Sequence, residues 1–221
     1  MKIDQQTLLQ AVDLLQRSDT TMRRIVETVG PCTLDVDQSP FRMLIKSIAG
    51  QQLSVAAART IWKRFLKING TQRVSAASLS RLTDTQLRGA GISGPKVVSI
   101  RGIQHAFAGR AISIRQLRAM SDDDVKTVLC DLRGVGPWTS DMFLMFGLGR
   151  LDVFPVGDLG LMNAIGAFYR QGERPGKDEL LEIGNRWSPY RTIATWYCWR
   201  GLDELRSGNI TISSYKGFTA L

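Results

Sequence analysis

The chain has very little histidine and cysteine, the side chains on which many catalytic and metal-binding sites depend. Its 221 residues include one histidine, His105, and three cysteines, Cys32, Cys130 and Cys198. A single histidine argues against a histidine-based metal site and against a Ser-His-Asp triad. The cysteines are odd in number and far apart, which fits neither a disulfide framework nor a Cys-x-x-Cys metal site. We therefore predict no metal bound by side chains, and we predict that Cys130 and Cys198 are small core residues.

Long apolar segments are absent as well. The chain opens on a polar stretch, Met1-Lys2-Ile3-Asp4, which is unlike a secretory signal peptide. No run of about 18 apolar residues occurs. These absences predict no membrane partner and a reducing compartment, cytoplasmic and nucleoid-associated, or nuclear in a eukaryote.

Positive charge is what the sequence has in excess. Lysine and arginine number 29 against 20 aspartate and glutamate residues, a formal net charge of +9. Such an excess favours a polyanionic partner, nucleic acid before a membrane, because no polybasic amphipathic helix stands out. Charge alone does not exclude an ordinary basic soluble protein. The 43% of hydrophobic residues is enough for a good core.

Apolar residues recur at helical spacing along nearly the whole chain. Alternation typical of strands is missing except in a short tail with some β character, at Ile210, Thr211 and Ile212. We predict an all-α fold of roughly a dozen helices. It forms a single domain with two lobes, one of about residues 40–150 and one of residues 1–39 with 151–221. Among the predicted helices are 5–17, 40–50 and 55–68, and a long one that begins near Arg191.

Two glycines, Gly134 and Gly136, straddle one residue just before a predicted helix. Glycine permits positive φ and lets a phosphate approach the backbone, and the amides of the following helix N-terminus then point at that anion. Pro137 suits the first helical turn. The segment 132–139 is therefore predicted to be a hairpin between two helices that grips a phosphate without reading sequence. A purely structural turn is the alternative.

Asp158 stands at the start of the next predicted helix, directly after Pro155-Val156-Gly157. One interpretation is an N-cap, because a carboxylate there accepts from the free amides of the first turn. The other is a carboxylate in a partly dry cleft that faces a cation formed during a reaction. Position in the chain does not decide between them.

A short junction, Gln51-Gln52-Leu53-Ser54, joins two predicted helices. Ser54 is a suitable N-cap for the second helix. Nothing in packing asks for two adjacent amides here. The junction is therefore either a plain helix-helix connection or a functional loop.

Taken together, these motifs resemble the helix-hairpin-helix DNA glycosylase superfamily, and within it the 3-methyladenine DNA glycosylase II (alkylbase) branch. The resemblance implies the compact form of the fold, without an N-terminal β domain, in which two helical lobes have a DNA-binding cleft between them. It implies a monomer that acts on double-stranded DNA with a damaged base. The matching segments are 48–54, Gly91-Ile92-Ser93 with Lys96, 132–139, Asp152-Val153-Phe154-Pro155, 158–160, 187–191 and 196–200.

The resemblance also implies the chemistry. Asp158 matches the catalytic aspartate, and Trp138, Met142 and Tyr190 match positions of the base pocket. Relatives that also cut the strand carry a lysine at the position of Trp138, which forms a Schiff base that tryptophan cannot form. The implied function is a monofunctional glycosylase of base excision repair, which flips out alkylated bases of the 3-methyladenine and 7-methylguanine type and hydrolyses their N-glycosidic bond. Core packing is the alternative role for Trp138 and Tyr190, and Gly157 stands where this branch often has a second acid.

The implied DNA contacts come from the junction and from the hairpin: Gln52, Leu53, Ser54, Gly134, Gly136 and Thr139. Gln52 and Leu53 match the residues that fill the gap left by a flipped base and push into the opposite strand. The four-cysteine motif of an iron–sulfur centre is absent, so no cofactor is expected. A monovalent cation held by main-chain carbonyls near Gly134 and Gly136 is the one exception that the resemblance implies.

Two alternatives stay open. The first is a non-catalytic helix-hairpin-helix DNA-binding module, which needs the hairpin but no acid at position 158. The second is a glycosylase for another damaged base, such as uracil, mismatched adenine or an oxidised base. Those branches mostly bring the cluster cysteines or the catalytic lysine, and both are missing here.

Overall fold

The computed structural model describes residues 3–211, and every regular element within that range is a helix. The all-α prediction is therefore confirmed. Residues 209–211 form no strand, so the β character of Ile210 and Thr211 has no structural counterpart, and Ile212 lies outside the described residues. No helix of residues 3–211 is long and apolar enough to span a bilayer.

The chain divides into two compact units. Unit 1 is Val36–Leu148, and unit 2 combines the chain up to Asp35 with the chain from Gly149 onward. Unit 1 contains α3 (Pro40–Gly50), α4 (Val55–Asn69), α5 (Ala76–Leu79), α6 (Asp84–Gly89), α7 (Gly94–Ala108), α8 (Ile114–Ala119), α9 (Asp122–Cys130), α10 (Pro137–Phe143) and the π-helical segment η1 (Leu144–Leu148). Unit 2 contains α1 (Gln5–Ser18), α2 (Thr20–Val29), α11 (Leu159–Tyr169), α12 (Lys177–Asn185) and α13 (Arg191–Arg206).

Helix α3 is the core element of unit 1. Pro40 occupies its first turn, where a missing N–H costs nothing, and Leu44, Ile45 and Ile48 are fully buried. The helix packs against α4, α7, α10 and η1. Because α3 is buried along most of its length, packing fixes the position of its C-terminal end, from which the junction 51–54 begins.

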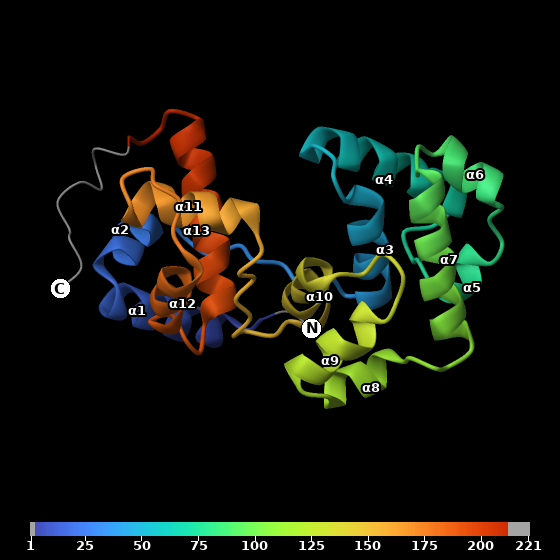
Figure 1. Cartoon of the computed structure of the whole chain (residues 1–221), viewed down its shortest axis with the longest axis horizontal. Coiled ribbons are helices and arrows are strands. Elements are labelled where there is room, and N and C mark those ends of the chain that lie inside the picture. Colours follow the sequence, from blue (N-terminus) through green and yellow to red (C-terminus); the bar gives the residue numbers. More distant parts are fainter. Residues whose placement is uncertain (1–2, 212–221) are drawn as a thin grey trace. The chain divides into compact units, whose positions relative to one another are not determined.

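Helix α13 has the same role in unit 2, where it packs against α2 and α11 (Figure 1). A buried carboxylate, Asp19, ties several elements of this unit together. It caps α2 by accepting from the Met22 amide at 2.8 Å, and it also accepts from the Tyr169 hydroxyl at 3.0 Å and the Trp187 indole at 3.2 Å. Three donors on one buried group stabilise it, because an unpaired carboxylate would be costly there.

The cysteines divide between core and surface. Cys198 is buried in α13, as predicted, and burial raises the pKa of its thiol. Cys130 is exposed, so the prediction that it is a core residue is wrong. It is the last residue of α9, whose buried positions are Val125 and Leu129. A one-residue shift from the buried Leu129 turns the side chain out of the core.

Candidate functional site

The glycine hairpin of unit 1 lies between α9 and α10. Gly134 has φ +84°, and a Cβ added there would overlap the Ser99 side chain. Backbone conformation and packing therefore both require glycine at this position. Gly136 differs, because its φ is −109° and a Cβ would meet nothing within 4 Å. The space above Gly136 is open, which is the feature that a close-approaching phosphate needs.

The junction between α3 and α4 presents its side chains to solvent. Gln52 adopts φ +57°, which is unusual for a residue with a side chain. Leu53 follows it with 40% of its surface exposed, and the Ser54 hydroxyl caps α4 by accepting from the Ala57 amide at 3.3 Å. An exposed leucine next to a residue with positive φ is not what a plain connection requires, and backbone conformations of this kind occur at functional sites.

Gln51 ties this junction to the hairpin. Its side-chain amide donates to the Gly134 carbonyl at 2.9 Å and to the Thr139 hydroxyl at 3.0 Å. Lys96, in the first turn of α7, donates to the Ala49 carbonyl at 3.0 Å and to the Gln51 carbonyl at 2.6 Å. Burial lowers the pKa of the Lys96 ammonium. The two segments expected to contact DNA are thus braced against each other by side chains.

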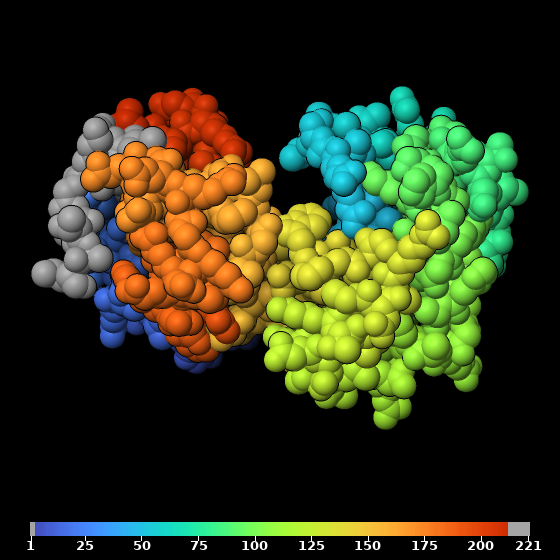
Figure 2. All heavy atoms as spheres, viewed as in Figure 1, coloured from blue at the N-terminus to red at the C-terminus, as the bar shows by residue number. Residues whose placement is uncertain are grey.

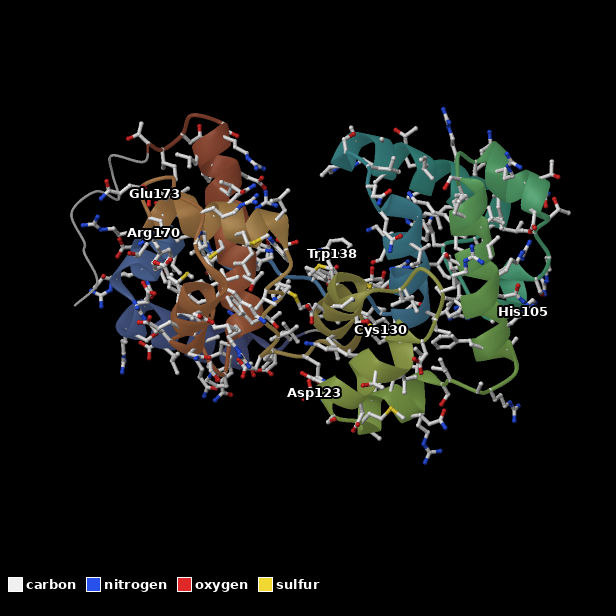
Figure 3. The ribbon with its side chains drawn as sticks, viewed as in Figure 1. His105, Asp123, Cys130, Trp138, Arg170 and Glu173 are labelled. Carbon is white, nitrogen blue, oxygen red and sulfur yellow. The ribbon has the colours of Figure 1, made fainter. Side chains whose placement is uncertain are left out.

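The two pocket residues expected in unit 1, Trp138 and Met142, differ in solvent exposure. Trp138 is 39% exposed, and its indole stands out from α10 (Figure 3). Met142 is buried one helical turn further on. Thr139 is also buried, and its hydroxyl is occupied by Gln51. Within unit 1, therefore, Trp138 is the more exposed of the two expected pocket residues.

Asp158, in unit 2, is the N-cap of α11. One of its oxygens, Oδ1, accepts from the Leu161 amide at 2.6 Å and from the indole N–H of Trp199 on α13 at 2.8 Å. The residue is only 8% exposed. The capping role proposed from the sequence is confirmed, and the carboxylate is held by a second helix as well. A negative charge at this end of α11 is favoured by the helix dipole.

Tyr190, the pocket candidate of unit 2, is half-buried at the start of α13. It lies between two residues that Asp152 holds. Arg191 donates to the two carboxylate oxygens of Asp152 at 2.7 and 2.9 Å, and the Ser188 hydroxyl donates at 2.9 Å. Burial raises the pKa of Asp152, but the hydrogen bonds and charge of Arg191, with the hydrogen bond of Ser188, outweigh it, so the pKa is lowered overall. This ion pair fixes the backbone on both sides of Tyr190.

Four supporting residues were not predicted as parts of the site: Gln51, Lys96, Asp152 and Trp199. For Gln51 the signal was present, since two adjacent amides in a short junction had no packing explanation. Trp199 is 41 residues from Asp158, and no local pattern links the two. Within the described part of the chain, no three His, Cys, Asp or Glu side chains gather as metal ligands.

The all-helical fold, the glycine hairpin and the capping aspartate define a class of DNA repair protein, and the comparisons agree. Residues 45–189 match the pattern of the HhH-GPD superfamily of base excision DNA repair proteins. The chain belongs to this superfamily.

Several of its relatives within that superfamily are named 3-methyladenine glycosylases. DNA-3-methyladenine glycosylase 1 of Schizosaccharomyces pombe is 30% identical over 187 residues, which cover 82% of each chain. The crystal structure of a DNA-3-methyladenine glycosidase from Bacillus halodurans superposes with a TM-score of 0.78 at 34% identity, covering 89% of this chain and 91% of that one. The S. pombe 3-methyladenine DNA glycosylase Mag1, in complex with abasic DNA, gives a TM-score of 0.80 at 29% identity, covering 91% and 99%.

Proposed function

We propose that the protein is a DNA glycosylase that hydrolyses the N-glycosidic bond of alkylated bases in double-stranded DNA, as a step of base excision repair. The observation that carries the proposal is the Asp158 carboxylate, which is buried at a helix N-terminus and accepts hydrogen bonds from the Leu161 amide and the Trp199 indole. Its relatives are named for the removal of 3-methyladenine. Bases of the 3-methyladenine and 7-methylguanine type are the proposed substrates.

In the proposed mechanism, the exposed Leu53 enters the stack as Gln52 fills the space of the flipped nucleotide. The resemblance gives Trp138 and Tyr190 as residues that bind the extruded base, and the positive charge of an alkylated purine favours stacking on aromatic π faces. The N-glycosidic bond then breaks, and Asp158 stabilises the positive charge that develops on the sugar. The alkylated base leaves as a neutral molecule with the electron pair of that bond, so no general acid is needed. Water then adds to the cationic sugar and releases one proton to solvent.

We further propose that the enzyme does not cleave the strand. A Schiff base needs an uncharged lysine near the sugar. Trp138 occupies the position of that lysine in strand-cutting relatives. Of the five lysines of unit 1, Lys96 binds two carbonyls and Lys126 pairs with Asp141 at 2.8 Å, while Lys46, Lys63 and Lys67 are exposed. Borohydride trapping on DNA with a damaged base should therefore yield no covalent adduct, and a trapped species would contradict this part of the proposal.

The remaining parts of the proposal concern ions and assembly. We propose that main-chain oxygens of the hairpin hold a monovalent cation, because a carbonyl that accepts one hydrogen bond, as that of Gly134 does from Gln51, keeps a second lone pair. Affinity for abasic-site DNA that rises with K⁺ at constant ionic strength would support it. We also propose that the protein is a monomer and that it is cytoplasmic and nucleoid-associated, or nuclear in a eukaryote.

The replacement Asp158→Asn tests the function itself. It keeps the size of the side chain and a cap oxygen but removes the negative charge. Excision of N-methylpurines under single-turnover conditions should fall by about 100-fold or more, with affinity for abasic-site DNA retained. Asp178→Asn is the matched control, an exposed acid in the first turn of α12, and should be as active as the wild type. If Asp158→Asn excised the base at the wild-type rate, Asp158 would not be the catalytic residue, and another group would have to carry the reaction.

A further inference from the structure

We propose that Trp199 is a positioning residue, whose indole N–H holds the Asp158 carboxylate in the orientation that excision requires. The inference rests on the proposed function of Asp158 and adds a residue to it. Trp199 lies in α13, beyond residues 45–189 but within the segment 196–200 that also carries the resemblance, which implied no role for it. Its effect on the reaction would pass entirely through Asp158.

The hydrogen bonds from Leu161 and Trp199 to Asp158 have different origins. The Leu161 amide belongs to the same helix, and its bond of 2.6 Å is the ordinary N-cap contact. The indole N–H of Trp199 comes from another helix and binds the same oxygen, Oδ1, at 2.8 Å. A cap bond alone still allows the carboxyl group to rotate and tilt. A second donor from a different direction restricts that motion, as a catalytic group requires.

The surrounding packing keeps the indole and the carboxylate together. Gly160 lies in the first turn of α11. A Cβ at this position would be 3.1 Å from Asp158 Oδ1 and 3.1 Å from both Cδ1 and Nε1 of Trp199. The indole and the carboxylate therefore lie directly against the backbone at Gly160, and little room is left for either to turn away.

The chemistry of the donor suits this role. An indole N–H donates and does not accept, and it carries no charge. It can fix a carboxylate oxygen without adding a positive charge next to it. Asp152 shows the contrast, because its partner Arg191 is a cation that neutralises the carboxylate. A carboxylate that must stabilise a cationic sugar is better held by a neutral donor.

The test is Trp199→Phe, which keeps an aromatic ring and removes the N–H. The expected result is a fall of about 10- to 100-fold in the single-turnover excision rate, with affinity for abasic-site DNA unchanged within about twofold. Trp196→Phe, in the same helix, is the matched control and should keep the wild-type rate. A second variant, Gly160→Ala, should lower the rate by crowding the same pair.

Two readouts separate positioning from general destabilisation. In the Asp158→Asn background, Trp199→Phe should cause no further loss, because there is no longer a carboxylate to position. The ¹⁵N-labelled indole signal of Trp199 should also shift in Asp158→Asn and stay unchanged in Asp178→Asn. If Asp158→Asn is inactive but Trp199→Phe excises normally, or if the two losses simply add, only the positioning role is overturned. If Asp158→Asn is fully active, the proposed function of Asp158 fails and the positioning role falls with it.

Discussion

The two units of the molecule differ most in how they use charge. Unit 1 contains 16 lysine and arginine residues against 7 aspartate and glutamate residues, whereas the rest of the chain contains 13 of each. The whole excess of +9 therefore belongs to unit 1. Between Asp37 and Asp122, Asp84 is the one acidic residue. Such a one-sided segment is suited to a polyanion and unsuited to self-contained ion pairing.

Unit 2 is neutral overall but places charge inside. Asp19 and Asp158 are 6% and 8% exposed, and both are held by indole and backbone donors. Unit 1 buries one acid as well, Asp141, which pairs with the cation of Lys126 at 2.8 Å, and it exposes side chains expected to touch DNA, Leu53 and Trp138 among them. We infer a division of labour, in which unit 1 supplies binding through exposed groups and unit 2 supplies chemistry through a buried, immobilised one.

The largest effect should come from the hairpin of unit 1. Gly134→Ala forces a side chain into positive φ and against Ser99, so the free energy of unfolding should fall by about 2–4 kcal/mol. Urea denaturation measures this loss. Gly136→Ala tests phosphate binding separately from folding, because the backbone at Gly136 is extended and a Cβ there would meet no neighbouring atom within 4 Å. That variant should fold normally yet bind DNA more weakly, because the methyl group blocks the phosphate. Normal stability of Gly134→Ala would contradict the structural reason for glycine there.

Features set by neighbours in sequence could be predicted. Ser54 and Asp158 cap α4 and α11 through bonds that span three residues, and α3 starts at Pro40 and ends at Gly50 as expected. Local hydrogen bonding and backbone preference decide such boundaries. The resemblance then supplied candidate roles, which stay predictions for Trp138, Met142, Tyr190 and the DNA-contacting residues.

Features set by packing could not be predicted. The amide of Gln51 reaches the carbonyl of Gly134, 83 residues away, and Trp199 reaches Asp158 across 41 residues. Neither pair has a periodicity or a spacing that reveals it, because the partner is chosen by how helices meet. The prediction for Cys130 failed for the same reason, since an apolar pattern does not say which side of the last turn faces the core.

The positive charge of α4 offers the next test of the difference in charge between the two units. Arg59, Lys63 and Lys67 are exposed and four residues apart, and the helix contains no acid. Like charges at this spacing repel by about 0.2–0.5 kcal/mol per pair, so they oppose helix stability. Figure 2 shows α4, in cyan, at the surface of unit 1.

Changing all three to glutamine should weaken DNA binding by about tenfold or more and lower the slope of log affinity against log salt by up to about 3. The single-turnover rate on saturating DNA should not change. The same change at Arg174, Lys177 and Arg206, three exposed cations of unit 2, is the control and should leave the slope unaltered. Equal losses from both sets would remove the distinction between the units.

A smaller effect is expected from the ion pair that fixes Tyr190 in unit 2. Asp152→Asn removes the charge that Arg191 binds and should cost about 1–2 kcal/mol of unfolding free energy at neutral pH. Because the pKa of Asp152 is lowered in the folded state, its contribution is complete above the ordinary carboxyl range and is lost as the pH falls through the lowered value. The difference between wild type and variant should therefore shrink below about pH 4.

Asp13→Asn is the control for this prediction. Asp13 forms an exposed pair with Arg17 within α1, at 2.9 Å, and its loss should cost about 0.5 kcal/mol or less. Urea denaturation at neutral and at acidic pH compares the two variants. A stability difference for Asp152→Asn that grows toward acidic pH would contradict a lowered pKa of Asp152 in the folded state.

The smallest effect should come from the brace between the junction and the hairpin. Gln51→Met keeps the length of the side chain but removes its bonds to Gly134 and Thr139, which should cost about 1 kcal/mol of stability and a few-fold in DNA affinity. Thr139→Val removes one of the two acceptors, so the double variant should lose less than the sum of the single ones. Because the brace lies within unit 1, the rate on saturating DNA should stay at the wild-type value. A fall in that rate, with affinity unchanged, would show that unit 1 takes part in the chemical step and would break the division between the two units.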